Sequence, residues 1–176
     1  MLHTPVSVPL RIRLPALLLA LLLAGCNVVG ASVGAGASSG AGVVFSAYND
    51  FLYTGPGAAY ANNKKGLERF LAKDYAGAGD IFATTLSSYP ANPDAVYYFG
   101  LCRIYLGARD EGFARLASYD DPNNFRITQE VRWWANYCAK KPELTPEKIR
   151  QVMNKARGEG YRRQIQEDWD DRLMGW

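Results

Sequence analysis

The chain of 176 residues is long enough for one compact domain and too short for two large ones. It carries 20 Lys and Arg against 17 Asp and Glu, but Arg11 and Arg13 lie in an N-terminal leader. The remaining 18 basic and 17 acidic side chains leave a charge close to +1, which argues against nucleic-acid binding. The one histidine, His3, is also in the leader, so a chain cleaved after it has no imidazole for a catalytic triad or a metal site.

Residues 1–25 have the pattern of a secretory signal. Arg11 and Arg13 precede an apolar run of 11 residues, Leu14 to Ala24, which is too short to span a bilayer and suits a signal-peptide core. The run ends in Leu23-Ala24-Gly25-Cys26, which resembles a bacterial lipobox. This resemblance implies cleavage before Cys26 and acylation of its thiol and its new amino group. The alternative is an ordinary signal peptide with a chance cysteine.

The residue after the lipobox cysteine indicates whether a lipoprotein is kept in the inner membrane or sent to the outer membrane. In lipoproteins of this type an Asp in that position favours retention in the inner membrane, and this chain has Asn27 instead. The resemblance therefore implies the periplasmic face of the outer membrane. Several acyl chains on one residue give stable anchoring, because each buried methylene contributes about 0.8 kcal/mol.

The segment after Cys26 is rich in glycine, alanine and serine and has no formal charge up to Tyr48. A flexible tether is the favoured interpretation, because so many glycines make a poor helix. The alternative is a membrane-inserting helix, since Gly30-xxx-Gly34 and Gly36-xxx-Gly40 have the spacing of closely packed membrane helices. The predicted organisation is a signal peptide at 1–25, an acylated tether at 26–58 and a helical domain at 59–176. Residues 48–60 should pack on the first helix and turn.

An internal repeat with a period of 34 residues dominates the domain. It aligns Gly66 with Gly100 and Trp134, and Phe82 with Leu116. The first unit reads GLERFLAKDY from Gly66 to Tyr75, followed by Ala78, Phe82, Leu86 and Pro90. These residues resemble a tetratricopeptide repeat at its small residue, its Asp-Tyr turn, its second-helix Ala and aromatic, and its closing proline.

The later units match less well. The second runs from Pro93 to about Asn124 and has Gly112 where the family usually has Ala. The third begins with a helix at about 128–140, in which Trp134 replaces the small residue. We expect Thr145 to cap the next helix, at about 146–156, and Gly158 and Gly160 to end it. A short separate helix at about 161–173 would then cap the domain.

The predicted fold is all-α: a short right-handed α-solenoid of about three tetratricopeptide-like hairpins plus a C-terminal capping helix. The resemblance covers residues 59–156 and implies a concave groove, lined by the first helix of each hairpin, that binds a peptide or helix of another protein. By matching position, the groove residues are Asn62, Asn63, Phe70, Tyr97, Leu101, Ile104 and Glu130. The alternative for each of them is a place in the core.

Cys102 and Cys138 are the thiols left once Cys26 is acylated. A disulfide between them is expected, because the periplasm is oxidising and the two residues fall in the first helices of adjacent repeats. Closing this loop of 36 residues would stabilise the domain by roughly 3–4 kcal/mol. The alternative is a pair of buried free cysteines.

These patterns favour a noncatalytic adaptor that holds another envelope protein or peptide in a secretion, pilus or envelope-assembly system. We expect no cofactor, metal or small-molecule substrate. The alternative is a periplasmic lipoprotein that binds cell-wall glycan through Trp133 and Trp169. An enzyme is least favoured, because acids such as Asp74 and Asp80 fall at turn and surface positions. The tail from Glu167 to Trp176 combines acids with two tryptophans and is either a cap or a recognition segment for a partner.

Overall fold

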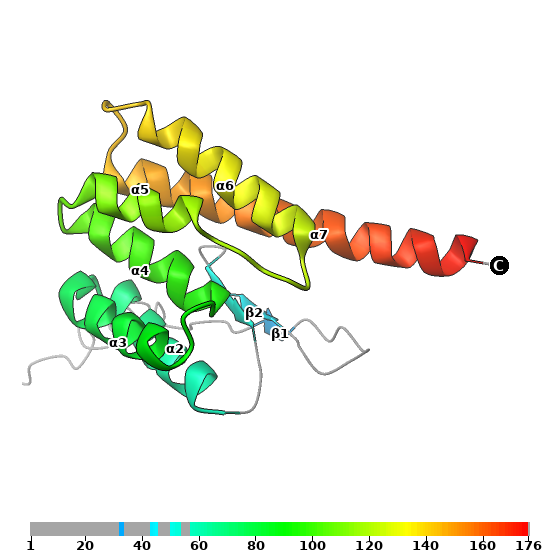
Figure 1. Cartoon of the computed structure of the whole chain (residues 1–176), viewed down its shortest axis with the longest axis horizontal. Coiled ribbons are helices and arrows are strands. Elements are labelled where there is room, and N and C mark those ends of the chain that lie inside the picture. Colours follow the sequence, from blue (N-terminus) through cyan, green and yellow to red (C-terminus); the bar gives the residue numbers. More distant parts are fainter. Residues whose placement is uncertain (1–31, 34–42, 46–49, 54–56, 176) are drawn as a thin grey trace, which may run out of the picture. The chain divides into compact units, whose positions relative to one another are not determined.

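The computed structural model describes residues 32–33, 43–45, 50–53 and 57–175. The signal peptide, Cys26, Asn27 and most of the glycine-rich segment lie outside these residues. Six helices occur in the described part of the chain (Figure 1): α2 Ala58–Leu71, α3 Tyr75–Ser88, α4 Pro93–Tyr105, α5 Arg109–Ala117, α6 Phe125–Ala139 and α7 Pro146–Met174.

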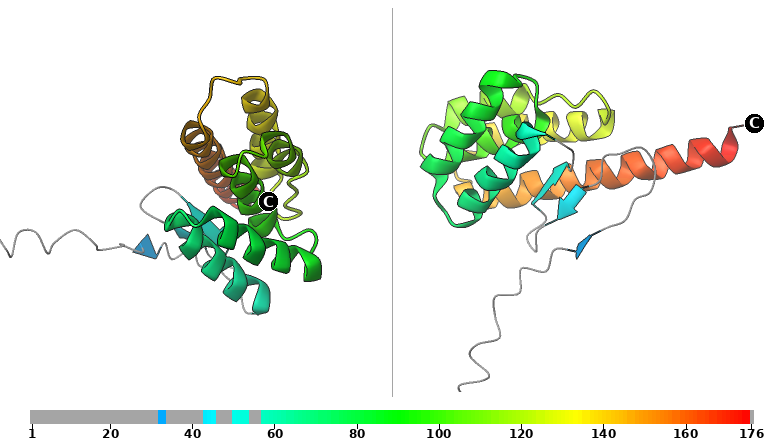
Figure 2. Two further views of the ribbon diagram at one scale, coloured as in Figure 1. Left: turned by 90° about the vertical axis from the view of Figure 1, so that its left-hand side faces the viewer. Right: turned by 90° about the horizontal axis from the view of Figure 1, so that it is seen from below.

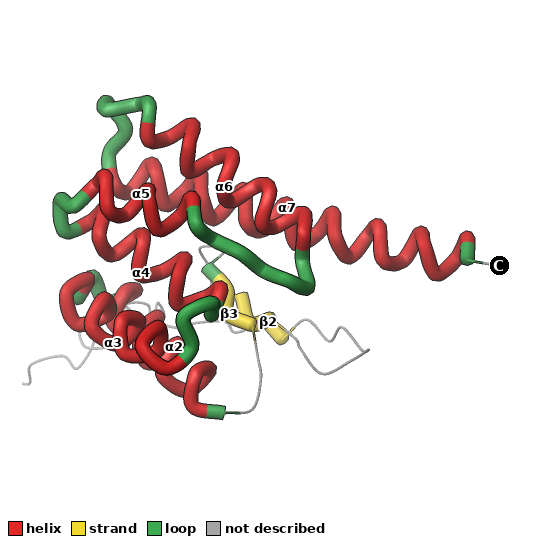
Figure 3. Tube along the Cα trace, in the orientation of Figure 1, coloured by secondary structure: helices red, strands yellow, loops and turns green. Residues whose placement is uncertain are grey.

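Consecutive helices pair as three hairpins, α2–α3, α4–α5 and α6–α7, and the hairpins stack in chain order because α3 packs on α4 and α5 on α6. Figure 2 shows this stacking from two further sides. The predicted all-α, solenoid-like architecture of helical hairpins is therefore confirmed. Figure 3 shows how short the loops are within the first two hairpins, which forces their helices to run antiparallel.

The turns of the hairpins recur at intervals of 34 residues. The backbone N–H groups of Lys73, Gly107 and Lys141 each donate to the carbonyl three residues earlier, at 3.0, 3.1 and 3.1 Å. Lys73 and Gly107 both adopt a positive φ, of 64° and 86°. Glycine adopts a positive φ without steric cost, whereas lysine is strained in it. The turn conformation therefore explains why residue 107 is a glycine.

Side-chain caps fix three of the helix starts. The side chains of Asp74, Asn92 and Thr145 accept hydrogen bonds from the backbone N–H three residues later, at 2.9, 2.9 and 3.2 Å. Pro93 and Pro146 occupy the first positions of α4 and α7, where the missing N–H costs nothing. The predicted cap at Thr145 is confirmed.

Glycines set the distance between helices in the first two hairpins. A Cβ added at Gly66 would lie 2.7 Å from Phe82 Cζ, and one at Gly100 would lie 2.9 Å from Leu116 Cγ. The two contacts join α2 to α3 and α4 to α5 at equivalent places, 34 residues apart. Each hairpin therefore closes only because its first helix has no side chain there.

The last helix differs from the prediction. Gly158 and Gly160 do not end it, and α7 continues as one helix of 29 residues. The reason is tertiary: a Cβ at Gly160 would lie 2.9 Å from Ile127 Cα, so the glycine lets α7 press against α6. Packing on a neighbouring helix outweighs the low helix propensity of glycine. The close crossing of the third hairpin is thus at Gly160, not at Trp134.

A small antiparallel sheet precedes the helices. Its strands are β1 Ser32–Val33, β2 Val43–Phe45 and β3 Phe51–Tyr53, in the order β1-β2-β3, with Val44 opposite Leu52. Aromatic and β-branched residues favour this conformation in β2 and β3. Where it is described, the segment expected to be a tether or a membrane helix is therefore strand.

Part of the predicted tether at 26–58 packs on the helices. Phe51 and Leu52 are buried in the core, and β3 contacts α2. The folded unit therefore includes Asp50–Tyr53. This agrees with the prediction that residues 48–60 pack on the first helix. Within the described residues, no helix has both the length and the apolarity that a bilayer span needs.

Adding one methyl group at the α4–α5 crossing should destabilise the domain. We expect Gly100→Ala to lower the free energy of unfolding by about 1–3 kcal/mol, because the new Cβ would also lie 3.0 Å from the backbone oxygen of Gly112. The matched control is Gly158→Ala, whose Cβ would meet nothing closer than 3.7 Å. This control should be neutral or stabilise by up to about 1 kcal/mol. Thermal denaturation followed by circular dichroism measures both, and equal effects would contradict the crossing.

Candidate functional site

The face predicted to be a groove is closed, and the groove assignment is wrong for most of its residues. Five of the seven are buried among other side chains: Asn63, Phe70, Tyr97, Leu101 and Ile104. Asn62 and Glu130 are half-buried. The first helices of the hairpins therefore present core side chains on this face.

Two elements of the same chain cover the face. Tyr97 in α4 donates its hydroxyl hydrogen to Asn154 Oδ1 in α7 at 2.8 Å, and Tyr98 donates to the Phe51 carbonyl of β3 at 3.0 Å. The helix α7 packs on α4 as well as on its hairpin partner α6. Strand β3 and the first half of α7 thus cover the face on which the tetratricopeptide resemblance predicts a bound peptide.

The polar residues of the predicted set have structural partners. Asn63 Nδ2 donates to Asn92 Oδ1 at 2.8 Å, and Asn92 is the N-cap of α4. Glu130 accepts a hydrogen bond from Trp134 Nε1 at 3.1 Å and pairs with Arg163 of α7 at 2.5 Å. These contacts join α2 to α4 and α6 to α7.

The centre of the covered face is a buried arginine. Arg157 is 1% exposed, forms an ion pair with Asp94 of α4, and donates to the Phe51 carbonyl at 3.0 Å. Aromatic rings surround its guanidinium; the nearest are Phe51 at 4.1 Å and Tyr97 at 4.5 Å from ring centroid to Cζ, with Tyr53, Tyr98 and Tyr119 within 5.9 Å. Burial alone would lower the pKa of Arg157, but Tyr119, Asp94 and the other tyrosines raise it well above its usual range.

A second acid–base contact lies beside the first. Arg150 Nη2 meets Asp50 Oδ2 at 2.5 Å, and Asn154 Nδ2 donates to the other carboxylate oxygen at 2.8 Å. Arg150 also lies 5.3 Å from the ring centroid of Phe70. Burial opposes the charge of Arg150, but the hydrogen bond to Asp50 and the charges of Asp50 and Glu147 together raise the pKa of this arginine above its usual range. The residue before β3 is thereby fixed to α7.

A pattern in the sequence could have indicated these residues. Arg150, Asn154 and Arg157 are spaced by four and three positions, so they share one face of the helix. The buried apolar residues Ile149, Met153 and Ala156 lie beside them. A polar row flanked by core residues indicates buried partners, and the acids Asp50 and Asp94 supply them.

The buried clusters do not form an open catalytic site. Asp50, Asp94 and Arg157 are buried, so a substrate in solvent has no route to their charged atoms. In the residues that the structure describes, no group of three or more His, Cys, Asp or Glu side chains is placed to hold a metal ion. The chemistry of these clusters is that of internal ion pairs.

The expected disulfide is not formed. Cys102 and Cys138 are both free and buried. Cys102 faces α3, where a Cβ added at Gly79 would lie 3.6 Å from its own Cβ, whereas α6 packs on α5 and α7. Burial raises the pKa of the Cys102 thiol to about 12 and also raises that of Cys138, so both act as small apolar side chains.

A group of exposed aromatic residues lies on α6. Trp133 and Tyr137 are 59% and 43% exposed, and their rings stack at 5.7 Å with an angle of 6° between the planes. Trp134 meets both edge-on, at 4.7 and 5.4 Å. Lys141 Nζ lies 5.7 Å from the Tyr137 ring centroid. We call Trp133, Trp134 and Tyr137 the α6 aromatic surface.

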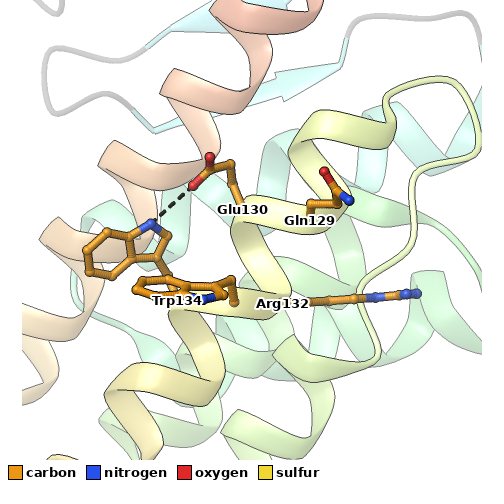
Figure 4. A pocket seen from close by; sticks show the side chains of 5 residues that line it. Gln129, Glu130, Arg132 and Trp134 are labelled. Atoms are coloured by element: carbon orange, nitrogen blue, oxygen red, sulfur yellow. Dashed lines mark hydrogen bonds between the residues drawn. The ribbon is translucent and has the colours of Figure 1, made fainter.

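Polar side chains border this surface. A shallow hollow is lined by Gln129, Glu130, Arg132, Trp133 and Trp134. Figure 4 shows Glu130 hydrogen-bonded to Trp134, with Arg132 directed away from that pair. Exposed aromatic rings with hydrogen-bonding groups at their edge are suited to binding another molecule.

Trp169, the other tryptophan named for glycan binding, does not belong to this surface. Arg126, near the first residue of α6, pairs with Glu167 of α7 at 2.8 Å. Since the two helices are antiparallel, Trp169 lies at or beyond the end of α6, while Trp133 lies at its middle. The predicted pair of tryptophans is therefore separated.

The sequence matches no protein-family model, and no significant match was found among curated proteins or solved structures.

Removing the buried arginine should cost more than removing an exposed one. We expect Arg157→Leu to lower the free energy of unfolding by about 3–5 kcal/mol, because Asp94 is left buried without a counter-charge. Adding Asp94→Asn should recover part of the loss. The control Arg126→Leu breaks an exposed pair with Glu167 and should leave the melting temperature close to that of the wild type. Similar urea midpoints for the two arginine variants would contradict the role assigned to Arg157.

Proposed function

We propose that the protein is a noncatalytic lipoprotein, anchored through Cys26 to the periplasmic face of the outer membrane, that acts as an adaptor for another envelope protein. The lipobox-like Leu23-Ala24-Gly25-Cys26 supports the anchor. The domain binds its partner through the α6 aromatic surface rather than through a concave groove, because the chain itself covers that face.

The exposed stack of Trp133 on Tyr137 is the observation that carries this proposal. Trp and Tyr are enriched among the residues that dominate binding energy at protein interfaces, and here they lie together with a polar border. The surface is also preorganised, because Trp134 is held by Glu130, which is held in turn by Arg163. A rigid aromatic surface loses little conformational entropy when a partner binds.

Binding of cell-wall glycan is the second candidate. The rings of Trp133 and Tyr137 stack with their planes parallel to within 6°, and an exposed aromatic face of this kind can stack against the apolar face of a sugar ring. Gln129, Glu130 and Arg132 at its border can donate to or accept from hydroxyl groups. In this hypothesis Trp133 contacts the sugar, and Trp169, which lies apart from it, does not.

Capture experiments test the adaptor role. In crosslinked envelopes, Trp133→Ala with Tyr137→Ala should reduce recovery of the partner at least tenfold, because each lost hot-spot residue costs about 2 kcal/mol or more. Tyr89→Ala is the matched control, since Tyr89 is also exposed but follows α3. Circular dichroism should show that both proteins remain folded. If the double variant instead keeps its protein partners and loses only binding to purified peptidoglycan, the glycan function replaces the adaptor function.

The anchor has its own test. Cys26→Ser removes the thiol that would be acylated, so the variant should accumulate as an unprocessed precursor without labelled fatty acid. Mass spectrometry of the N-terminal peptide and metabolic labelling with a palmitate analogue measure this. Fatty-acid labelling equal to that of the wild type would rule out Cys26 as the site.

A further inference from the structure

The last part of α7, residues 161–174, is called here the C-terminal arm. One of its faces packs on α6: the Arg126 N–H donates to Gln164 Oε1 at 3.3 Å, and Arg163 pairs with Glu130. Glu167 holds Arg126 on the same face. Figures 1 and 2 show the arm continuing past the start of α6.

The opposite face of the arm is apolar and exposed. Ile165, Trp169 and Leu173 are spaced by four residues and are 38%, 56% and 72% exposed. At about 100° per residue they form one stripe, whose centre lies on the far side of the helix from Glu167 and Gln164. Each of these side chains keeps an exposed surface in the described part of the chain, and the Arg172 guanidinium lies 5.9 Å from the Trp169 ring centroid. An apolar stripe of this kind marks an interaction surface.

We propose that the stripe pairs with the same stripe of a second copy of the chain, with the two arms antiparallel about a two-fold axis at Trp169. Ile165 and Leu173 are each four residues from Trp169, so Ile165 of one copy lies opposite Leu173 of the other. The apolar residues of the stripe are thereby matched along its whole length, as a self-complementary two-fold interface requires.

The charges of the arm complement each other in this register. Arg172 and Asp168 flank the stripe on the same side, three residues after and one residue before Trp169. In the antiparallel pair, Arg172 of one copy comes within about 3 Å along the helix axis of Asp168 of the other. The two-fold axis makes this contact twice.

The same charges disfavour a membrane surface as the occupant. The arm carries three arginines and four acids, and its acids Asp168 and Asp170 flank the stripe on its two sides. Helices that lie on anionic lipid have basic residues in these positions. The pairing is also independent of the adaptor function, because the α6 aromatic surface lies on another helix.

Mixed cysteine variants of the full chain test the register. We expect Ile165→Cys and Leu173→Cys, mixed under mild oxidation, to form a crosslinked dimer, while each alone crosslinks at least tenfold less. Cys102 and Cys138 are buried, and the wild-type chain controls for Cys26. The matched control mixes Ile165→Cys with Asp171→Cys, which lies on the far side of the helix and should not crosslink.

Sedimentation velocity of the full chain in nonionic detergent gives the affinity. Trp169→Ala should raise the dimer dissociation constant at least tenfold with unchanged helical content. Asp168→Arg should weaken the dimer, and adding Arg172→Asp should restore it. A monomeric wild type at all concentrations would overturn the proposal, as would equal crosslinking in the Asp171 control. Binding of the wild type to phosphatidylglycerol vesicles that is lost in Trp169→Ala would also overturn it and identify the stripe as a membrane contact.

Discussion

The ion pair between Arg157 and Asp94 is the contact on which the arrangement of the domain depends. It joins α7 to α4, and through the Phe51 carbonyl it also joins both to β3. Removing two charges from water is expensive, and the pair is tolerated because aromatic rings and hydrogen bonds surround the guanidinium. The ion pair and the hydrogen bond to the Phe51 carbonyl require α4, α7 and β3 to be packed together. The contact therefore selects a single packing, at the expense of some of the stability that an apolar core would give.

This arrangement explains why a solenoid-like stack of hairpins lacks an open groove. The first half of α7 lies against α4 as well as α6, and β3 fills the remaining space, so the inner face is used for the internal contacts of the domain. Most residues of this face are therefore buried and not available to other molecules. The exposed aromatic residues of α6 and the apolar stripe of the α7 arm face outward, and each is held in place by pairs between α6 and α7.

Local signals in the sequence predicted the helices well. The turn at Asp74-Tyr75, the cap and proline at Thr145-Pro146, and the small residues at Gly66 and Gly100 act within one hairpin, and the structure has each of these features. Long-range contacts were not predictable in this way. Gly160 breaks no helix because Ile127 packs on it, and β3 enters the core through partners 47 and 106 residues away in the sequence. The groove residues were assigned by their position in a repeat, although Phe70 and Leu101 have the apolar character of core residues.

The place where β3 enters the domain determines how the domain would bear a mechanical load. Tension that passes β1 and β2 from the N-terminal side reaches Asp50, and Asp50 is held by Arg150 and Asn154 of α7. The next carbonyl, that of Phe51, is held by Tyr98 of α4 and by Arg157. Force would therefore pass directly into the last two hairpins through these hydrogen bonds, and into the first hairpin through the contact between β3 and α2. A domain loaded in this way resists being peeled apart one helix at a time from its first hairpin.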